Sequence, residues 1–334
     1  GVRDSFFSLG GTSLLAVRLM ARIQERWDHD LPLATIFEHP TVERLAGLVR
    51  QQVAPQAWSA LVRLQGGAAR PPLFLMHAVG GNVLDYAALL PHLDDDQPVY
   101  GLQSRGLYGD ESPHTTIEAM AADYLDEIRA VQPHGPYALG GYSMGGLIAL
   151  EIANQLRAKG ETVALLALLD TIPPAANRNL EELQQADDSA LVREIFRALG
   201  VPLDEVAAGS FEGLLEGALQ RITAAGLVPP DLPMPAFRRA IDVFLSNSRA
   251  HSNYAVAPST GAMTLFCTTA PRDADVIDPA LIWRSLAPAV EVVPIDATHL
   301  TALDEPAAGQ IARRLAADLR ALAKHSAEEP TPWQ

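Results

Sequence analysis

The sequence is poor in cysteine and in positive charge, and it contains no long apolar run. Cys267 is the only cysteine among the 334 residues, so no disulfide can form within the chain. The formal net charge is −15, with 40 acidic residues against 25 basic ones, which argues against a nucleic acid as partner because a phosphate backbone attracts a basic surface. The longest apolar runs, such as Val163 to Leu169, are far shorter than the roughly 18 residues that span a membrane.

These absences also favour one cell compartment. A single cysteine fits a reducing environment. No charged stretch followed by an apolar stretch and a small-residue cleavage site opens the sequence, so we expect no secretion signal and a cytoplasmic protein. Cys267 lies in the strand-like segment "MTLFCTT", and we interpret it as a buried, unreactive thiol. We predict no metal site.

The length and the distribution of charge indicate two units. The chain is 48% hydrophobic, enough for a sizeable core, and a prior of about 150 residues per domain suggests two domains. Residues 1–50 carry six acidic and six basic side chains, so the whole excess of negative charge lies downstream. We therefore expect a small neutral unit followed by a larger acidic one.

The first unit has a helical pattern. Apolar residues recur at helical spacing from Ser13 to Trp27, and Thr41 is placed to cap a further helix. Everything up to about residue 50 therefore favours helix. The segment 51–59 has no clear period and contains a proline, so we interpret it as a linker.

From residue 60 onward the pattern changes to short apolar segments that alternate with helices. This alternation is typical of a mostly parallel sheet covered on both faces, so the predicted class is α/β. Between about 171 and 235 the strand signals stop, and helical segments lie between proline-rich stretches, a pattern typical of a lid. Helices are predicted in 117–128 and 144–159, and strands in 61–65, 72–79, 99–103, 136–143, 163–170, 262–269 and 290–295.

The segment "GYSMG", residues 141–145, fits the G-x-S-x-G pattern between a predicted strand and a predicted helix. A sharp strand-to-helix turn strains the serine backbone, and the flanking glycines avoid clashes with neighbouring backbone. We therefore predict that Ser143 is a nucleophile. The backbone N–H of Met144, at the helix N-terminus, is a candidate donor to developing negative charge.

A serine nucleophile needs a base and an acid that orients it. His299 follows the last predicted strand, in "VVPIDATHLTAL", where a base is expected, whereas the other histidines lie in the helical unit, in other loops or in the tail. Two choices remain for the acid. Asp170 ends an unbroken apolar strand and is the favoured candidate, while Asp273 or Asp275, after the next strand, would keep the same Ser, Asp, His order.

A second oxyanion donor is expected in the loop after an early strand. "HAVGG", residues 77–81, follows "LFLM" and contains the glycines that a close backbone approach needs. We choose the backbone N–H of Val79 as this donor.

The segment "DSFFSLGGTSLLA", residues 4–16, resembles the carrier-protein motif of nonribosomal peptide synthetases. The similarity continues through "IFEHPTVERLAGLV". It implies that Ser13 carries phosphopantetheine as a covalent cofactor, and a phosphodiester at a helix N-terminus would meet free N–H groups and the favourable end of the dipole. Carriers of this family have a helix before the "VRDSFF" loop, so we expect a peptidyl carrier that lacks its first helix, in a fragment of a larger synthetase.

From residue 60 to about 325 the chain resembles the C-terminal type I thioesterase of such synthetases. The similar segments are "PLFLMHAVGG", "YALGGYSMGGLIALEIA", "LLALLDTIPP" and "DATHLTALDEPAAGQIA". The resemblance implies an α/β-hydrolase fold with a helical lid, and it places the acid at Asp170. Family members often have a glycine two residues before the histidine, where this chain has Ala297.

Together the two resemblances imply the terminal module of a nonribosomal peptide synthetase, which belongs to antibiotic and other secondary metabolism. Ser143 would take the peptide from the carrier thioester and release it by hydrolysis or macrocyclisation. The implied partners are upstream condensation and adenylation domains, a phosphopantetheinyl transferase and the peptidyl substrate, and we expect a monomer. The expected organisation is 1–50 carrier, 51–59 linker, 60–325 thioesterase and 326–334 tail.

Three other functions are compatible with parts of the sequence. A proofreading thioesterase that acts in trans would normally lack a fused carrier. A stand-alone esterase or lipase would use the same three residues, but it leaves the Ser13 segment unexplained. A carrier fused to an inactive hydrolase-like docking domain would be no enzyme, and the complete Ser, Asp, His set argues against it.

Overall fold

A computed structural model gives the fold of the chain. It describes residues 1–334 except 12, 28, 30, 52–57, 68, 69, 109, 110, 205–208, 260, 273, 274, 288 and 329–334, and for residues 13, 14, 51 and 325–328 it describes the backbone alone.

The described residues form one seven-stranded sheet with the order β1-β3-β2-β4-β5-β6-β7. All neighbouring strands are parallel except β1, which pairs antiparallel with β3 at one edge. The predicted mostly parallel α/β sheet is therefore confirmed. The strands are β1 (Leu61–Gln65), β2 (Leu73–Met76), β3 (Val99–Leu102), β4 (Tyr137–Tyr142), β5 (Val163–Leu169), β6 (Met263–Thr268) and β7 (Val290–Ile295).

Helices connect the strands and extend from both ends of the sheet. The α-helices are α1 (Ser13–Trp27), α2 (Thr35–Glu38), α3 (Val42–Gln51), α4 (Ile117–Val131), α5 (Met144–Ala158), α6 (Leu180–Gln185), α7 (Asp188–Ala198), α8 (Phe211–Ala224), α9 (Met234–Asn253), α10 (Pro279–Leu286) and α11 (Ala307–Glu328). Short 3-10 turns are η1 (Leu84–Ala88), η2 (Leu90–His92), η3 (Pro174–Ala176) and η4 (His299–Thr301).

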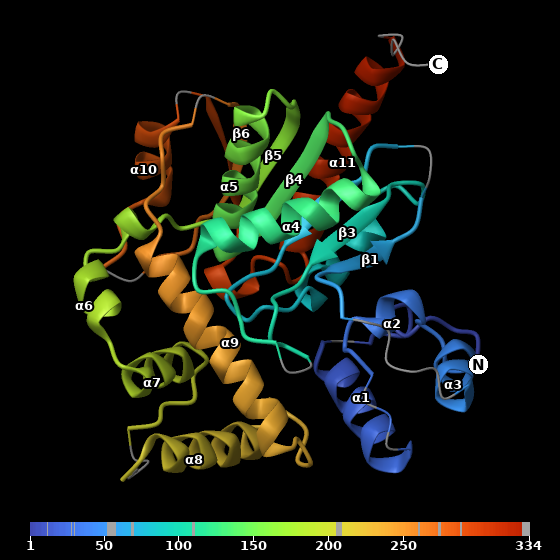
Figure 1. Ribbon diagram of the computed structural model, residues 1–334, viewed down its shortest axis with the longest axis vertical. Coiled ribbons are helices and arrows are strands. Elements are labelled where there is room, and N and C mark those ends of the chain that lie inside the picture. Colours follow the sequence, from blue (N-terminus) through green and yellow to red (C-terminus); the bar gives the residue numbers. More distant parts are fainter. Residues whose placement is uncertain are drawn as a thin grey trace.

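Both faces of the central strands are buried, which explains why β2, β4 and β5 are continuously apolar, whereas the edge strands β1 and β7 are partly exposed. In β2, Leu73 and Leu75 belong to one hydrophobic cluster with α11, while Phe74 and Met76 belong to a second cluster with α4 and α5. Figure 1 shows α4 and α5 in front of the sheet and α11 behind it. The carboxyl ends of the parallel strands therefore meet at one edge between two helical layers.

The helical insertion between β5 and β6 is longer than the sequence pattern predicts. Helices α6 to α9 build it, and α7, α8 and α9 share a hydrophobic cluster of their own. The expected end near residue 235 is wrong, because α9 runs on to Asn253. Pro233 precedes α9 and Pro235 lies in its first turn, so this proline-rich stretch starts a helix, as proline favours at a first turn. It does not end the helical segment.

The N-terminal helices lie against the edge of the sheet that β1 forms (Figure 1). Helix α2 packs on β1, with Ile36 fully buried, and the Leu33 N–H donates to the Tyr108 hydroxyl at 2.6 Å. The Thr41 hydroxyl accepts from the Arg44 N–H at 3.2 Å, as expected of the cap of α3. In the part of the chain that the structure describes, no helix combines the length and the apolar character that crossing a bilayer requires.

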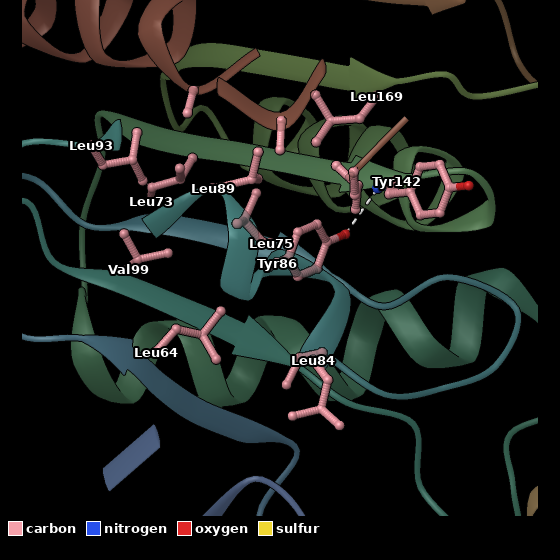
Figure 2. Packing of buried hydrophobic residues seen from close by; sticks show 14 of the residues in the cluster. Leu64, Leu73, Leu75, Leu84, Tyr86, Leu89, Leu93, Val99, Tyr142 and Leu169 are labelled. Carbon is pink, nitrogen blue, oxygen red and sulfur yellow. Dashed lines mark hydrogen bonds between the residues drawn. The ribbon is translucent and has the colours of Figure 1, made fainter. Parts of the chain in front are cut away.

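A buried tyrosine joins the ends of two central strands. The Tyr86 hydroxyl donates to the Met76 carbonyl at the end of β2 and accepts from the Tyr142 N–H at the end of β4, at 2.9 Å in the second case. Figure 2 shows this second bond within the hydrophobic cluster that also contains Leu75 and Leu169. Tyr86 therefore ties together the strand ends on which the candidate site is built.

The Tyr86→Phe variant should lower the free energy of unfolding by about 1–3 kcal/mol, because it leaves a buried N–H and a buried carbonyl unpaired. The matched control is Tyr100→Phe, since the Tyr100 ring stacks on Phe74 and its hydroxyl has no hydrogen bond among the described residues. Urea denaturation of both variants measures the difference. Equal losses would contradict the role given to the Tyr86 hydroxyl.

Candidate active site

Ser143 occupies a strained turn between β4 and α5. Its backbone has φ 55° and ψ −123°, a region that residues with a side chain rarely adopt. The Ser143 N–H donates to the Leu169 carbonyl at 2.9 Å, and the Ser143 carbonyl accepts from the Gly146 N–H at 3.1 Å. The turn is thus fixed on both sides, and the serine lies at the N-terminus of a buried helix.

The glycines of the motif are required by close backbone approach. A Cβ at Gly141 would lie 2.2 Å from the carbonyl of Gly145, and a Cβ at Gly145 would lie 2.1 Å from the Met76 carbonyl oxygen. Any larger residue would push α5 away from the end of β2. The G-x-S-x-G spacing therefore has a direct packing cause.

His299 is the first residue of η4, the turn that follows the last strand. Thr298 forms a reciprocal capping box with Thr301, which fixes the start of the turn. The Tyr142 ring stacks on the imidazole with 5.2 Å between centroids and 29° between planes, and the Tyr142 hydroxyl donates to the His299 carbonyl. In this position His299 Nε2 is 3.1 Å from Ser143 Oγ.

Asp170 lies on the other side of the imidazole. Its Oδ2 is 2.7 Å from His299 Nδ1, and the residue is only 3% exposed. Its backbone also has a positive φ, 46°, and its N–H donates to the Phe266 carbonyl at 2.7 Å. Of the two alternatives, Asp273 is outside the described residues, and Asp275 has no hydrogen bond to His299 among the residues described.

The charge of Asp170 is stabilised by donors from the end of β6 and from the loop that follows it. Thr268 donates its N–H at 2.9 Å and its hydroxyl at 3.0 Å, and Arg272 Nη2 lies 2.5 Å from Oδ1. Burial alone would raise the pKa of this carboxyl. The hydrogen bonds from His299, Arg272 and the Thr268 N–H outweigh burial and hold the pKa well below its ordinary value, so Asp170 is ionised at neutral pH.

Sequence reasoning missed two of these contacts. Arg272 is 102 residues from Asp170 in the chain, and no local pattern connects them. Tyr142 was visible only as the variable residue of the motif, with no sign that it would stack on a histidine 157 residues away. Cys267, predicted to be buried, is half-buried, and burial raises the pKa of its thiol, which keeps it protonated.

The two predicted oxyanion donors lie in different segments. Met144 is the first residue of α5, and Val79 lies in the loop after β2. Among the described residues no hydrogen bond is donated by either N–H. The Ala78 carbonyl, which shares a peptide group with the Val79 N–H, accepts from His77 Nδ1 at 2.7 Å and from the Gly81 N–H at 2.9 Å.

His77, the first residue of this loop, is fully buried, and among the described residues it forms no hydrogen bond with Ser143. Its Nε2 accepts from the Tyr124 hydroxyl at 2.8 Å, because Nδ1 carries the proton that it donates to Ala78. Burial lowers the pKa of His77 from 6.5 to about 4, against the opposing effect of the bond to Ala78. His77 is therefore neutral at pH 7 and acts as a fixed support of the loop.

Ser13 begins α1, and no acidic residue lies in the first turn of that helix. The preceding glycines have a local reason. Gly10 has φ 83°, and a Cβ at Gly11 would lie 2.4 Å from the Phe6 ring. The turn before α1 thus requires glycine at position 10 for its backbone conformation and at position 11 for packing.

These features define the α/β-hydrolase fold. The sheet is mostly parallel, the serine lies at the turn from β4 to α5, the buried acid follows β5, and the histidine follows β7, the last strand. The chain belongs to the thioesterase domain family, whose model matches residues 71–319. A second family model, for the phosphopantetheine attachment site, matches residues 1–49. The resemblances to a carrier protein and to a thioesterase are thereby confirmed.

Curated relatives include two large synthetases. The chain is 33% identical over 325 residues to a dimodular nonribosomal peptide synthase of Bacillus subtilis (strain 168), covering 97% of this chain and 14% of that protein. It is 34% identical over 304 residues to malpinin synthetase of Mortierella alpina, covering 90% of this chain and 4% of that protein. The chain therefore spans only a small part of these relatives.

The chain is also similar to solved structures of a nonribosomal peptide synthetase and of a thioesterase domain. A four-domain nonribosomal peptide synthetase in the holo form, AB3403, bound to AMP and glycine, aligns with a TM-score of 0.71 at 28% identity, over 99% of this chain and 25% of that one. The NocB thioesterase domain in covalent complex with a fluorophosphonate nocardicin G analogue aligns with a TM-score of 0.54 at 27% identity, over 76% of this chain and 95% of that one.

The pKa of His77 predicts how stability depends on pH. The unfolded chain binds a proton at this histidine near pH 6.5, whereas the folded chain binds it only near pH 4. The free energy of unfolding should therefore fall between pH 6.5 and pH 4, with about 3 kcal/mol of that fall due to His77.

The His77→Gln variant should lose that part of the pH dependence. Its matched control is His134→Gln, because the His134 side chain is 88% exposed. Urea unfolding at several pH values between 7 and 4 measures the slope for each protein. An unchanged slope in His77→Gln would show that His77 is not held neutral in the fold.

Proposed function

We propose that Ser143, His299 and Asp170 form the catalytic triad of a thioesterase that releases the product of a nonribosomal peptide synthetase. The observation that carries the proposal is the position of His299, with Nε2 3.1 Å from Ser143 Oγ and Nδ1 2.7 Å from Asp170 Oδ2. The identity of the relatives as synthetases supports the substrate class, a peptidyl thioester.

In the first half of the reaction, Ser143 Oγ attacks the thioester carbonyl carbon while its proton passes to His299 Nε2. Negative charge develops on the carbonyl oxygen, and the N–H groups of Met144 and Val79 donate to it. When the tetrahedral species collapses, the C–S bond breaks and His299 gives its proton to the leaving thiolate. The peptide is then an ester of Ser143.

In the second half, His299 takes a proton from the incoming nucleophile. Water gives a linear acid, whereas an amine or hydroxyl of the peptide itself gives a ring. The nucleophile attacks the Ser143 ester, the same two N–H groups stabilise the charge, and His299 returns a proton to Ser143 Oγ. The helices between β5 and β6 would act as a lid that controls the access of water.

Asp170 has a separate task. Because its pKa is held well below the ordinary value, it stays ionised through the cycle. It accepts the hydrogen bond of His299 Nδ1 and so keeps Nε2 free to act as base toward Ser143. It also stabilises the imidazolium that forms when His299 is protonated.

We also propose that Ser13 is the attachment residue for phosphopantetheine. A helix N-terminus without acidic residues in its first turn suits a phosphodiester. When bound, the group would supply a flexible arm that ends in the thiol of the peptidyl thioester. The chain's contribution is the position of Ser13 at the start of α1 and a helical unit packed on β1.

The proposed organisation is a carrier at 1–50, a linker at 51–59 and a thioesterase at 60–325, followed by a tail. The proposed partners are a phosphopantetheinyl transferase and the condensation and adenylation domains of the same synthetase. A cytoplasmic location and a monomeric state stay predictions.

A fluorophosphonate probe should label Ser143 covalently in the wild-type protein. Labelling should disappear in Ser143→Ala and slow on the order of 10⁴-fold in Asp170→Asn, because the histidine would then be held in the wrong tautomer. Peptide mapping by mass spectrometry locates the label. The control is Ser112→Ala, an exposed serine of another loop, which should label like the wild type. Labelling that persists in Ser143→Ala would contradict the proposed nucleophile.

Incubation with coenzyme A and a promiscuous phosphopantetheinyl transferase should add one phosphopantetheine to the chain. The addition should be lost in Ser13→Ala and kept in Ser8→Ala, an exposed serine five positions earlier in the same segment. Intact-protein mass spectrometry measures the addition. If the wild-type protein gains no mass, the assay is repeated with a first carrier helix added before residue 1. A second failure would contradict the carrier part of the proposal and favour a stand-alone esterase.

A further inference from the structure

Helix α9 contacts both loops of the candidate site. Val243, Asn247 and His251 recur every four residues, so they lie on one face of the helix. We call residues 77–81, which contain Val79, the oxyanion loop. A Cβ at Gly81 would lie 2.7 Å from Val243 Cγ1, so Val243 packs against this loop. His251 Nε2 donates to the Ile172 carbonyl at 3.1 Å, two residues after Asp170.

Between these two contacts, Asn247 reaches the oxyanion loop directly. Its side chain is fully buried, and its Nδ2 donates to the Val79 carbonyl at 2.9 Å. The neighbouring Ala78 carbonyl accepts from His77 Nδ1 and from the Gly81 N–H. The peptide group before Val79 is thus fixed by His77 and Gly81, and the peptide group after it is fixed by Asn247.

Fixing both peptide groups fixes the direction of the Val79 N–H. The Val79 N–H belongs to the peptide group that His77 and Gly81 hold, and the Asn247 bond restricts rotation of the following peptide group about the Cα bonds of Val79. An oxyanion donor stabilises charge only when it already points at the developing oxygen. Asn247 therefore contributes to the orientation of this donor without approaching the reacting atoms.

Asn247 is also an unfavourable residue for stability alone. Its Oδ1 is buried and has no hydrogen-bond partner among the described residues. A buried acceptor without a partner destabilises the fold, and an apolar side chain of similar volume would avoid this cost. An asparagine here is better explained by the donor it supplies than by packing.

We propose that Asn247 is a positioning residue that couples the helical lid to the oxyanion hole. The inference rests on the proposed function, in which the Val79 N–H is one of the two oxyanion donors. Asn247 belongs to the helix that carries the lid cluster, since α9 contributes Phe237 and Ile241 to it. Any movement of the lid that carries α9 outward would break the bond to Val79, so the oxyanion hole is complete only while α9 is in place.

The test compares Asn247→Leu and Asn247→Asp with the wild type. Asn247→Leu removes the donor at similar volume, and Asn247→Asp keeps the shape but places a carboxylate oxygen against the Val79 carbonyl. The matched controls are Asn253→Leu and Asn253→Asp, at an exposed position on the same helix. The probes are an acyl N-acetylcysteamine thioester as substrate and a boronic acid as a mimic of the tetrahedral species.

We expect kcat to fall about 10- to 100-fold in both Asn247 variants, with KM within about twofold of the wild type, because the lost interaction acts in the transition state. The affinity for the boronic acid should fall by the same factor as kcat/KM. The melting temperature of Asn247→Leu should change little, because removing the unpaired Oδ1 stabilises the fold while leaving the Val79 carbonyl without its donor destabilises it. The Asn253 variants should match the wild type in every measurement.

Two results would overturn the inference. One is a kcat within twofold of the wild type in both Asn247 variants. The other is a loss of activity that follows a fall in melting temperature with no change in boronic acid affinity, as a merely structural role would give. Ser143→Ala in the same assay distinguishes a failure of the proposed function from a failure of the role given to Asn247. Activity that survives in Ser143→Ala contradicts the proposed function and this inference with it, whereas activity lost there but kept in the Asn247 variants overturns this inference alone.

Discussion

The buried carboxylate of Asp170 is the group on which the arrangement of the site depends. A charge that is only 3% exposed is tolerated only if donors surround it. The donors are His299, after β7, Thr268, the last residue of β6, and Arg272, in the loop after β6. Because one carboxylate binds all three, the requirement to pair it brings separate strand ends together and sets the position of the imidazole.

Ser143 is fixed by a second constraint, close packing. The glycines around it allow α5 to touch the end of β2, and Tyr86 ties that end to β4. The electrostatic constraint orients His299 and the packing constraint orients Ser143, and they meet in the 3.1 Å contact between the two side chains. On our proposal, Asn247 adds a third constraint, which extends this preorganisation to the oxyanion loop and to the lid.

The sequence predicted the parts of the site that depend on local pattern. The strands and the turn at Ser143 follow from periodicity and glycine spacing, whereas the choice of His299 also uses the place after the last strand at which this kind of fold positions its base. Arg272, Tyr142 and Asn247 could not be found in this way, because each acts on a residue more than 100 positions away. The end of the helical insertion was misplaced because proline both breaks helices and starts them.

The most direct test of the account is to follow an acyl group from Ser13 to Ser143. The chain would be charged with a short aromatic acyl group from the corresponding acyl-coenzyme A by a phosphopantetheinyl transferase, quenched in acid at successive times, digested and mapped by mass spectrometry. We predict an acyl ester on the Ser143 peptide that forms as the Ser13 thioester decays, and no such ester in Ser13→Ala. A thioester on Ser13 that decays equally fast in the wild type and in Ser143→Ala, with no ester on Ser143, would contradict the account.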